Sequence, residues 1–307
     1  MRYAPIALFT YSRVDHTRQA VESLLQNAEA KDSDLYIFSD GPKTEEKHAA
    51  VEENRKYIHS ITGFKSVTIV EREKNWGLAN SLIAGITDIV NKHGRVIVVE
   101  DDLILSPYFL KFMNDGLEKY EQNDRVASIS GFLNPVEGNI PETFFLRYFA
   151  CWGWATWKRA WDLLNTDARD LLRQLRWKKN DFNIGGGGAF YEMLYCQKVG
   201  LVDSWAVRFY ASCFLKNKLH LFPGVSMVRQ IGIDGSGTHC TTTDSTYDSM
   251  KLCMSHINIK DIKVEENLIM YNIFTKFYCK KRNMRFFLHK YGEFKSLVRR
   301  LLGIDYK

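Results

Sequence analysis

The first hundred residues alternate between short apolar runs and longer segments in which apolar residues recur every three or four positions. A run of four apolar residues bounded by polar ones is typical of a buried strand, and the three-to-four spacing is typical of a helix. The predicted strands are IALF at 6–9, LYIF at 35–38, VTIV at 67–70 and VIVV at 96–99. The predicted helices lie at 17–28, around 57–61 and at 78–90.

Strands that alternate with helices predict a parallel sheet with helices on both faces. In such sheets, ligands bind beyond the carboxyl ends of the strands. We therefore expect functional residues in the four segments that follow the strands, which are TYSR at 10–13, SDGPK at 39–43, EREKNWG at 71–77 and EDDL at 100–103.

Composition narrows the class of protein. The chain has 307 residues, of which 45% are hydrophobic and 25% charged, an ordinary globular mixture. No stretch of about 18 uncharged apolar residues occurs, so no transmembrane helix is predicted.

The apolar run near the N-terminus is too short for a secretory signal. The six cysteines lie singly, which predicts reduced thiols rather than a zinc or redox motif, and we expect a cytoplasmic location.

The positive charge is concentrated at the C-terminus. Residues 276–307 hold ten Lys/Arg and two Asp/Glu, so the rest of the chain has a net charge of −2 although the whole has +6. Two interpretations stay open for this tail: a solvated helix packed on the body, or an interfacial segment attracted to anionic lipid. Nucleic acid is not an expected partner, because the body has no basic excess.

Three consecutive carboxylates, Glu100, Asp101 and Asp102, directly follow the fourth predicted strand. Like charges at such spacing are unfavourable unless something neutralises them. A solvated strand end is the plain alternative. The other interpretation is a site for Mg²⁺ or Mn²⁺, since these ions prefer oxygen ligands and often bridge a protein carboxylate to substrate phosphates.

The segment VIVVEDDLILSPYFLKF at 96–112 looks like the metal-binding segment of GT-A glycosyltransferases, especially N-acetylglucosaminyltransferase I and bacterial family-two sugar transferases. The resemblance implies that Asp102 ligates Mn²⁺ or Mg²⁺, with Asp101 and Glu100 beside a nucleotide sugar. It also implies an α/β fold of GT-A type, a mainly parallel twisted sheet flanked by helices. A basic helical C-terminal extension would follow this sheet.

The other strand ends resemble the same family in the same order, and the resemblance covers roughly residues 3–245. TYSR resembles the segment that frames the base, Asp40 matches an acid that contacts uridine, and NWG resembles the segment beside the diphosphate sugar. A plain surface turn remains the alternative for SDG. The nucleotide-sugar residues implied in this way are Thr10, Tyr11, Arg13, Asp40, Asn75 and Gly77.

The second half is rich in aromatic residues and glycine. In CWGW, Trp152 or Trp154 is expected near a sugar, because flat rings stack on sugar faces and the pair resembles a family segment on the acceptor side; core packing is the alternative. The four glycines at 185–188 are no phosphate loop, since they lack GxxxxGK[ST]. They form either a plain connection or a segment that orders over a substrate.

The candidate catalytic base is Asp203, because VGLVDSWAVRFY resembles the family segment that carries an acid next to a tryptophan. Ser204, not an acid, directly precedes the tryptophan here, so Glu192 and Asp181 stay as alternatives. A role for Asp203 as a helix N-cap is also open. His239 lies in GSGTHC, which resembles the segment that closes near the pyrophosphate, where an imidazole ligates the metal or bonds a phosphate.

These observations predict a GT-A domain at 1–255, with a nucleotide-sugar half at 1–105 and an acceptor half at 106–255, followed by the extension at 256–307. By resemblance, the chain is a metal-dependent inverting glycosyltransferase. It moves a sugar from a nucleotide-sugar donor, preferably a UDP-sugar, to a glycan or lipid-linked acceptor in bacterial surface-polysaccharide synthesis, at the inner face of the plasma membrane.

Two alternative functions were weighed. A sugar-phosphate nucleotidyltransferase would need a glycine-rich, basic loop after the first strand, and TYSRVDH does not supply one. A non-catalytic carbohydrate-binding protein would explain the tryptophans but not three acids at a strand end.

Overall fold

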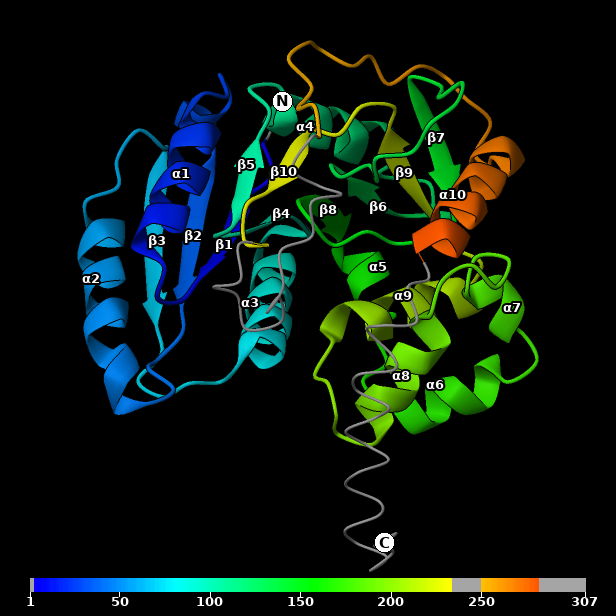
Figure 1. The fold of residues 1–307 in the computed structure, drawn as a ribbon. Helices are drawn as coiled ribbons and strands as arrows, with labels where there is room; N and C mark the ends of the chain where they lie inside the picture. The colour runs from blue at the N-terminus through cyan, green and yellow to red at the C-terminus, as the bar shows by residue number, and fades with distance from the viewer. Residues whose placement is uncertain (1–2, 234–249, 282–307) are drawn as a thin grey trace, which may run out of the picture.

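The computed structural model of the protein describes residues 3–233 and 250–281. Within these ranges, eight strands form one sheet in the order β3-β2-β1-β4-β8-β6-β9-β7 (Figure 1). The strands of this sheet are β1 Ile6–Thr10, β2 Asp34–Ser39, β3 Ser66–Glu71, β4 Arg95–Glu100, β6 Val126–Ser130, β7 Thr143–Leu146, β8 Trp154–Trp157 and β9 Leu219–Pro223. A second, two-stranded sheet pairs β5 Leu103–Leu105 with β10 Val228–Gln230.

The sheet is parallel in its first half and mixed in its second. β1 pairs in parallel with β2 and β4, and β2 pairs in parallel with β3. β8 is antiparallel to both β4 and β6, β6 is parallel to β9, and β7 is antiparallel to β9. All four strands predicted from the apolar runs are present, and each extends one or two residues beyond its run. The predicted α/β class with a mainly parallel sheet is therefore confirmed.

Helices cover both faces of the sheet. The described helices are α1 Val14–Leu25, α2 His48–His59, α3 Leu78–His93, α4 Phe109–Lys119, α5 Lys158–Trp161, α6 Ala168–Leu175, α7 Lys179–Phe182, α8 Phe190–Lys198, α9 Trp205–Leu215 and α10 Leu268–Lys281, with short 3-10 turns at Ala30–Asp32 and Glu45–Lys47. Because strand side chains alternate between the two faces, Ile6 and Leu8 pack with α1, α2 and α4. Ala7 and Phe9 pack instead with α3, α5, α6 and α9.

The strand order reverses between β1 and β4. The chain moves outward from β1 through β2 to β3, and the crossover through α3 then returns it to the other side of β1. The carboxyl ends of β1 and β4 therefore meet at a topological switch point, where α/β sheets bind ligands. The β5–β10 pair lies immediately beyond β4 and brings residues 228–233 back to this edge (Figure 1).

The described part of the predicted C-terminal extension packs on the sheet. Ile257 belongs to the core around α1 and α4. Met270 and Phe274 of α10 are fully buried beside Phe144 of β7, which lies next to α10 in Figure 1. The tail predicted at 276–307 lies outside the described residues from residue 282 onward.

The glycine run at 185–188 connects α7 to α8 and contacts α10. A Cβ at Gly187 would lie 2.6 Å from the backbone oxygen of Thr275, closer than real Cβ atoms approach. Gly185 has a φ of +62°, a conformation that L side chains rarely adopt. The run is therefore a connection whose glycines admit the backbone of α10.

Among the described helices, none is both long enough and apolar enough to cross a bilayer.

Candidate active site

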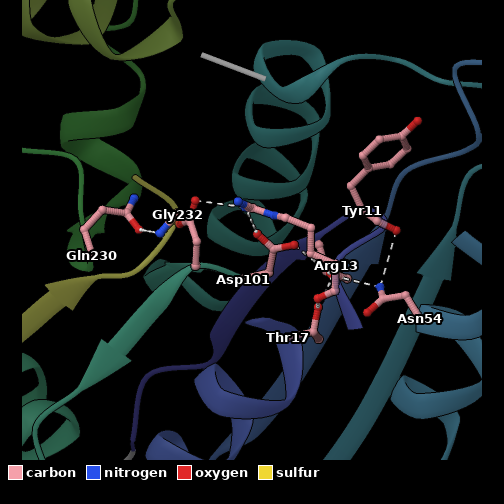
Figure 2. Close-up of polar contacts among 9 residues, drawn as sticks. Tyr11, Arg13, Thr17, Asn54, Asp101, Gln230 and Gly232 are labelled. Atoms are coloured by element: carbon pink, nitrogen blue, oxygen red, sulfur yellow. Dashed lines mark hydrogen bonds and ion pairs between the residues drawn. The ribbon is translucent and has the colours of Figure 1, made fainter. Parts of the chain in front are cut away.

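The guanidinium of Arg13 joins two of the three carboxylates at the switch point. Its Nη2 atom lies 2.7 Å from Asp101 Oδ1 and 2.9 Å from Asp102 Oδ2 (Figure 2). Arg13 lies directly before α1, in the segment that follows β1, and the two acids lie directly after β4. The contacts between Arg13 and the acids therefore connect the carboxyl ends of β1 and β4. All three side chains are mostly buried, with exposed fractions of 21%, 8% and 17%.

A layer of buried hydroxyl and amide groups supports Asp101. Thr10 Oγ1 lies 3.4 Å from Asp101 Oδ2 and 2.8 Å from Thr17 Oγ1. Asn54 of α2 donates from Nδ2 to the same Thr10 oxygen at 2.8 Å. Figure 2 shows Thr17 and Asn54 on the side of Arg13 away from Gly232. Because this layer is buried and hydrogen-bonded, it fixes Asp101 more firmly than a solvated strand end would be fixed.

Two polar atoms at the centre are left unsatisfied. Among the described residues, neither Asp102 Oδ1 nor Arg13 Nη1 has a hydrogen-bond partner, although both atoms are buried. An unpartnered buried carboxylate oxygen is costly unless a ligand takes it up. Asp102 Oδ1 is therefore suited to a hard cation, which prefers carboxylate oxygen.

The cation would need further ligands from elsewhere. In residues 3–233 and 250–281, no three His, Cys, Asp or Glu side chains form a metal-binding group. Asp102 is thus suited to a cation that also takes water and phosphate oxygens, as Mg²⁺ does. His239, the second predicted metal ligand, lies outside the described residues.

The electrostatics of the cluster are dominated by burial and by mutual repulsion. Burial and the charges of Asp102 and Asp101 raise the pKa of Glu100 to about 8. Burial also raises the pKa of Asp101, although Arg13 opposes the shift. Burial alone would lower the pKa of Arg13, but the two carboxylates outweigh it and hold that pKa above its usual value. Burial and mutual repulsion therefore disfavour the charged forms of Glu100 and Asp101, and Arg13 opposes this effect.

A segment from the second half of the chain lies within electrostatic range of these acids. Burial raises the pKa of Cys151, and the charges of Glu100 and Asp102 raise it further. Cys151 directly precedes Trp152, one of the two tryptophans that the sequence singled out. The sequence analysis did not select Cys151 as a site residue. The position of Cys151 in CWGW, directly before Trp152, was the feature that could have pointed to it.

The segment after β10 closes over the acid cluster. The backbone N–H of Ile231 donates to the backbone oxygen of Asp102 at 2.8 Å, and that of Gly232 donates to Gln230 Oε1 at 2.8 Å. A Cβ at Gly232 would collide with the Asp102 carboxylate and would lie 2.9 Å from Arg13 Nη1. Figure 2 shows Gln230 and Gly232 approaching from the side opposite Tyr11. Sequence reasoning did not select Gly232, because nothing in its spacing signals this approach.

Asp40 connects the end of β2 to the segment before α3. Its Oδ1 accepts hydrogen bonds from the backbone N–H of Trp76 at 2.8 Å and of Gly41 at 3.0 Å. Its Oδ2 accepts from the N–H of Gly77 at 2.9 Å. Asn75 Nδ2 donates to the backbone oxygen of Gly41 at 2.8 Å. The structure thus brings Asp40, Asn75 and Gly77 together, and it uses both Asp40 oxygens to hold this turn.

The outer wall of the same edge is aromatic and basic. Trp76 is 44% exposed, and the guanidinium of Arg72 lies 3.8 Å from the centroid of its ring. The hydroxyl of Tyr11 accepts a hydrogen bond of 2.9 Å from the backbone N–H of Lys43. Arg72 and Trp76 lie within EREKNWG, a strand end that was expected to carry functional residues, although neither residue was chosen.

The two tryptophans of CWGW have different surroundings. Trp154 has no exposed surface, and its ring stacks on that of Trp205 with centroids 5.5 Å apart. Its predicted contact with a sugar is therefore wrong, because β8 points this side chain into the core. Trp152 is half-buried and packs edge-on against Phe132 at 4.5 Å. Trp152 remains the candidate for a sugar contact.

Asp203 and Glu192 both have cationic partners. Asp203 Oδ1 lies 2.9 Å from Arg208 Nη2, and its side chain is 54% exposed. Ser204 rather than Asp203 caps α9, with its hydroxyl accepting from the N–H of Val207. Glu192 is paired with Lys179 at 2.7 Å and also accepts from Asn183.

Asp181, the third candidate base, is held by two hydrogen bonds from Arg147 at 2.8 and 2.9 Å. Its carboxylate therefore has a structural partner at both oxygens.

The sequence profile of glycosyl transferase family 2 matches residues 6–196, which contain the carboxyl ends of β1 to β4. The chain belongs to this family. It is a glycosyltransferase, and the resemblance to GT-A glycosyltransferases stated from the sequence is confirmed. The family match favours this activity over the nucleotidyltransferase and the non-catalytic binding protein that were weighed as alternatives. A comparison with curated proteins finds no match.

Among solved structures, this glycosyltransferase is similar to the mannosyltransferase PcManGT from Pyrobaculum calidifontis, solved in complex with GDP-Man and Mn²⁺. The two share 10% sequence identity over 69% of this chain and 70% of that chain, and the TM-score is 0.35. It is also similar to S. aureus TarS, at 13% identity over 45% of this chain and 23% of that chain, with a TM-score of 0.30. A UDP-glucose pyrophosphorylase complexed with UDP-glucose matches at 11% identity, 72% and 90% coverage and a TM-score of 0.39. Likenesses this distant do not bear on substrate or metal.

A glycosyltransferase must bind a donor with an anionic leaving group and must bring an acceptor hydroxyl to the anomeric carbon. The switch point offers carboxylates directly after β4, an arginine at the N-cap of α1 and a backbone turn that Asp40 holds at the start of α3. This arrangement is suited to holding the donor, since groups on rigid elements hold geometry better than groups on loops.

Proposed function

We propose that this family 2 glycosyltransferase transfers a sugar, with inversion, from a nucleotide-sugar donor bound at the switch point, and that it uses Mn²⁺ or Mg²⁺ held by Asp102. The observation that carries the proposal is the buried, unpartnered Asp102 Oδ1 beside the Arg13–Asp101 pair, in the part of the chain that the structure describes. The cation would neutralise charge that develops on the leaving diphosphate.

The roles of the donor-site residues follow from their positions. Glu100 and Asp101 lie where ribose and sugar hydroxyls would donate hydrogen bonds, and Thr10 supports Asp101. Tyr11 stands at the end of β1, where a nucleobase would be framed. Asp40 acts as a positioning residue: it fixes the turn through Asn75 and Gly77, whose backbone would face the diphosphate. A UDP-sugar is the donor that we expect, from the family resemblance around Asp40.

Asp203 is the proposed general base. The acceptor hydroxyl would give its proton to the Asp203 carboxylate while the hydroxyl oxygen forms a bond to the anomeric carbon from the face opposite the phosphate. The bond from that carbon to the phosphate oxygen breaks, and the nucleoside diphosphate leaves with the electron pair. The exposure of Asp203 supports this role, because a base must reach the acceptor; Glu192 is more enclosed by its two partners.

The acceptor is proposed to be a glycan or a lipid-linked sugar in bacterial surface-polysaccharide synthesis. The half-buried ring of Trp152 supports a sugar acceptor, because it stands one residue after Cys151, whose pKa the charges of Glu100 and Asp102 raise. The setting in polysaccharide synthesis is supported by the family resemblance alone.

Peripheral binding to an anionic membrane is proposed on charge. Residues 282–307, outside the described ranges, hold seven Lys/Arg and two Asp/Glu. Among the described residues, Trp177 is 85% exposed between Arg176 and Lys178. Exposed tryptophan beside basic residues is favourable at a membrane interface. We expect sedimentation with anionic but not neutral liposomes, reversed by salt and lost on removal of 282–307 together with Trp177→Ala; full binding by that variant would contradict the proposal.

The proposed donor chemistry is tested by thermal stability with nucleotide sugars in the presence and absence of Mn²⁺. We expect at least one nucleotide sugar, and its nucleoside diphosphate, to raise the melting temperature only when Mn²⁺ is present. Stabilisation by a nucleoside triphosphate together with a sugar phosphate, and by no nucleotide sugar, would contradict it.

A further inference from the structure

Arg13 supplies the positive charge between two acids of the proposed donor site. A single nitrogen of its guanidinium, Nη2, contacts the carboxylates of Asp101 and Asp102 at 2.7 and 2.9 Å. A buried arginine normally uses several of its five N–H groups, and an arginine paired with a carboxylate is often bidentate. Here the second terminal nitrogen, Nη1, has no partner among the described residues, and neither has the second oxygen of Asp102.

The Arg13–Asp102 contact places a positive charge beside the acids, but among the described residues it leaves one guanidinium nitrogen and one carboxylate oxygen without a partner. Two carboxylates held close together and away from water need a positive charge between them. The incompleteness means that the Arg13–Asp102 contact can be exchanged without breaking a fully satisfied network. Asp101 differs, because Thr10 also holds it from β1.

The guanidinium and a metal ion cannot share Asp102 without cost. A divalent cation on Asp102 would stand within a few ångströms of Arg13, and like charges at that separation repel strongly in a partly buried site. The repulsion is relieved if the guanidinium turns toward an anion, and a diphosphate offers oxygens that match its fork of donors. Arg13 Nη1, which has no partner among the described residues, is the donor suited to that contact.

We infer that Arg13 is an internal counter-ion that competes with the catalytic cation for Asp102, and that it makes cation binding depend on the nucleotide. Without nucleotide, Arg13 holds Asp102 and the cation binds weakly. With a nucleoside diphosphate, Arg13 leaves Asp102 for the phosphates and the cation takes its place. The inference rests on the proposed function, since it assumes that Asp102 is the cation ligand.

The test measures Mn²⁺ affinity by titration calorimetry and by electron paramagnetic resonance of free Mn²⁺, without nucleotide and with saturating UDP or GDP. In the wild-type protein we expect weak binding that tightens with one of the two nucleotides. In Arg13→Met we expect Mn²⁺ alone to bind at least about tenfold more tightly than in the wild type, because the competing ion pair is gone. In the same variant, the factor by which nucleotide tightens Mn²⁺ binding should be smaller than in the wild type. By linkage, Mn²⁺ and the nucleotide strengthen each other's binding by this same factor.

Arg18→Met is the matched control. Arg18 lies on α1 close to Arg13, but its side chain is 48% exposed and its partner Asp15 is at 3.5 Å. This variant removes one positive charge from the helix that follows Arg13 and leaves the Arg13–Asp102 contact in place, so Mn²⁺ affinity in Arg18→Met should equal that of the wild type. An equal gain in both variants would show a general charge effect and would overturn the inference.

The outcomes separate the inference from the proposed function. If neither the wild type nor Arg13→Met binds Mn²⁺ with any nucleotide, both fail. If the wild type binds Mn²⁺ with nucleotide, and Asp102→Asn does not, the proposed function stands. In that case, Mn²⁺ binding by Arg13→Met that is unchanged or weaker overturns the inference alone and shows that Arg13 only positions the acids.

A second measurement covers the case in which Arg13→Met does not fold. The side-chain ¹⁵N resonances of Arg13 in the wild type, assigned through Arg13→Lys, report on its partner. We expect them to shift on addition of Mg²⁺ together with the nucleotide and to shift little with Mg²⁺ alone. Resonances that stay unchanged in the ternary complex would mean that Arg13 keeps its ion pair, and the inference would be wrong.

Discussion

Asp40 Oδ2 accepts a hydrogen bond of 2.9 Å from the backbone N–H of Gly77, and this bond ties the end of β2 to the start of α3. Gly77 stands at the N-cap of α3 with a φ of +76°, so the turn needs both glycine at this position and an acceptor for its N–H. The carboxylate also accepts from Trp76. Asp40 therefore shapes the turn before α3 through its contacts with the backbone.

Asp40→Asn should destabilise the protein by about 1–3 kcal/mol, because the amide nitrogen would face a backbone N–H where an oxygen now accepts. Urea denaturation measures this change. Asp15→Asn is the control: that carboxylate is 80% exposed, and its loss should change the free energy of unfolding by about 0.5 kcal/mol or less. Equal stability of Asp40→Asn and the wild type would contradict the positioning role.

The parallel half of the fold was predictable because its signals are local. The apolar runs of β1 and β4 are fully buried and that of β2 largely so, and strands covered on both faces read as unbroken apolar runs. The run of β3, at the edge of the sheet, is only partly buried. The rule that ligands bind at strand ends then selected Asp40 and Arg13, as well as the acids after β4. The structure brings all of these residues to one edge.

The rest of the site depends on contacts between distant segments. Gly232 covers Asp102 because β10 pairs with β5, and that pairing leaves no local signal in the sequence. Trp154 was misread because a tryptophan in a strand can face either the core or a ligand, and only the register of β8 against β4 and β6 decides between them. Asp40 matched a family position, but its three backbone contacts could not be read from spacing.

His220 gives a prediction about pH. This residue of β9 is fully buried with Nδ1 2.7 Å from Ser128 Oγ, and burial lowers the pKa of its imidazole to about 3. The unfolded chain takes up a proton below about pH 6.5 while the folded protein does not, so this residue makes folding less favourable as pH falls. Because of His220, the free energy of unfolding should fall by about 1.4 kcal/mol for each unit by which the pH is lowered between about pH 6 and pH 4.

The free energy of unfolding, measured by urea denaturation at a series of pH values, checks this slope. For His220→Gln, the free energy of unfolding should change less steeply with pH between about pH 6 and pH 4, by about 1.4 kcal/mol per pH unit. This variant should also be less stable than the wild type near pH 7. Parallel curves for the two proteins would mean that His220 becomes protonated in the folded state.

Gly232→Ala tests whether the close approach of Gly232 constrains the carboxylate of Asp102. The added methyl group would collide with the carboxylate of Asp102. Displacing a catalytic group by a fraction of an ångström or more is costly, so we expect turnover to fall at least about tenfold, with weaker cation binding. Ile233→Ala, which removes atoms from the neighbouring residue, is the control and should retain cation binding. Wild-type turnover in Gly232→Ala would show that the segment after β10 does not constrain Asp102.

The assignment of the base is tested by a pair of variants. Asp203→Asn should bind nucleotide sugar and cation with little change in affinity but transfer about 10²–10⁴ times more slowly, since loss of a general base acts on the chemical step. Glu192→Gln should transfer near the wild-type rate. If the two results are reversed, Glu192 is the base.

The central claim is metal-dependent sugar transfer at Asp102, and it is tested most directly by release of nucleoside diphosphate from a panel of nucleotide sugars. The assay compares the wild type with Mn²⁺, the wild type with EDTA, and Asp102→Asn with Mn²⁺. We predict release from one donor by the wild type with Mn²⁺, lower by at least about a hundredfold in the other two conditions. Full activity in EDTA, or turnover of Asp102→Asn near that of the wild type, would contradict the claim.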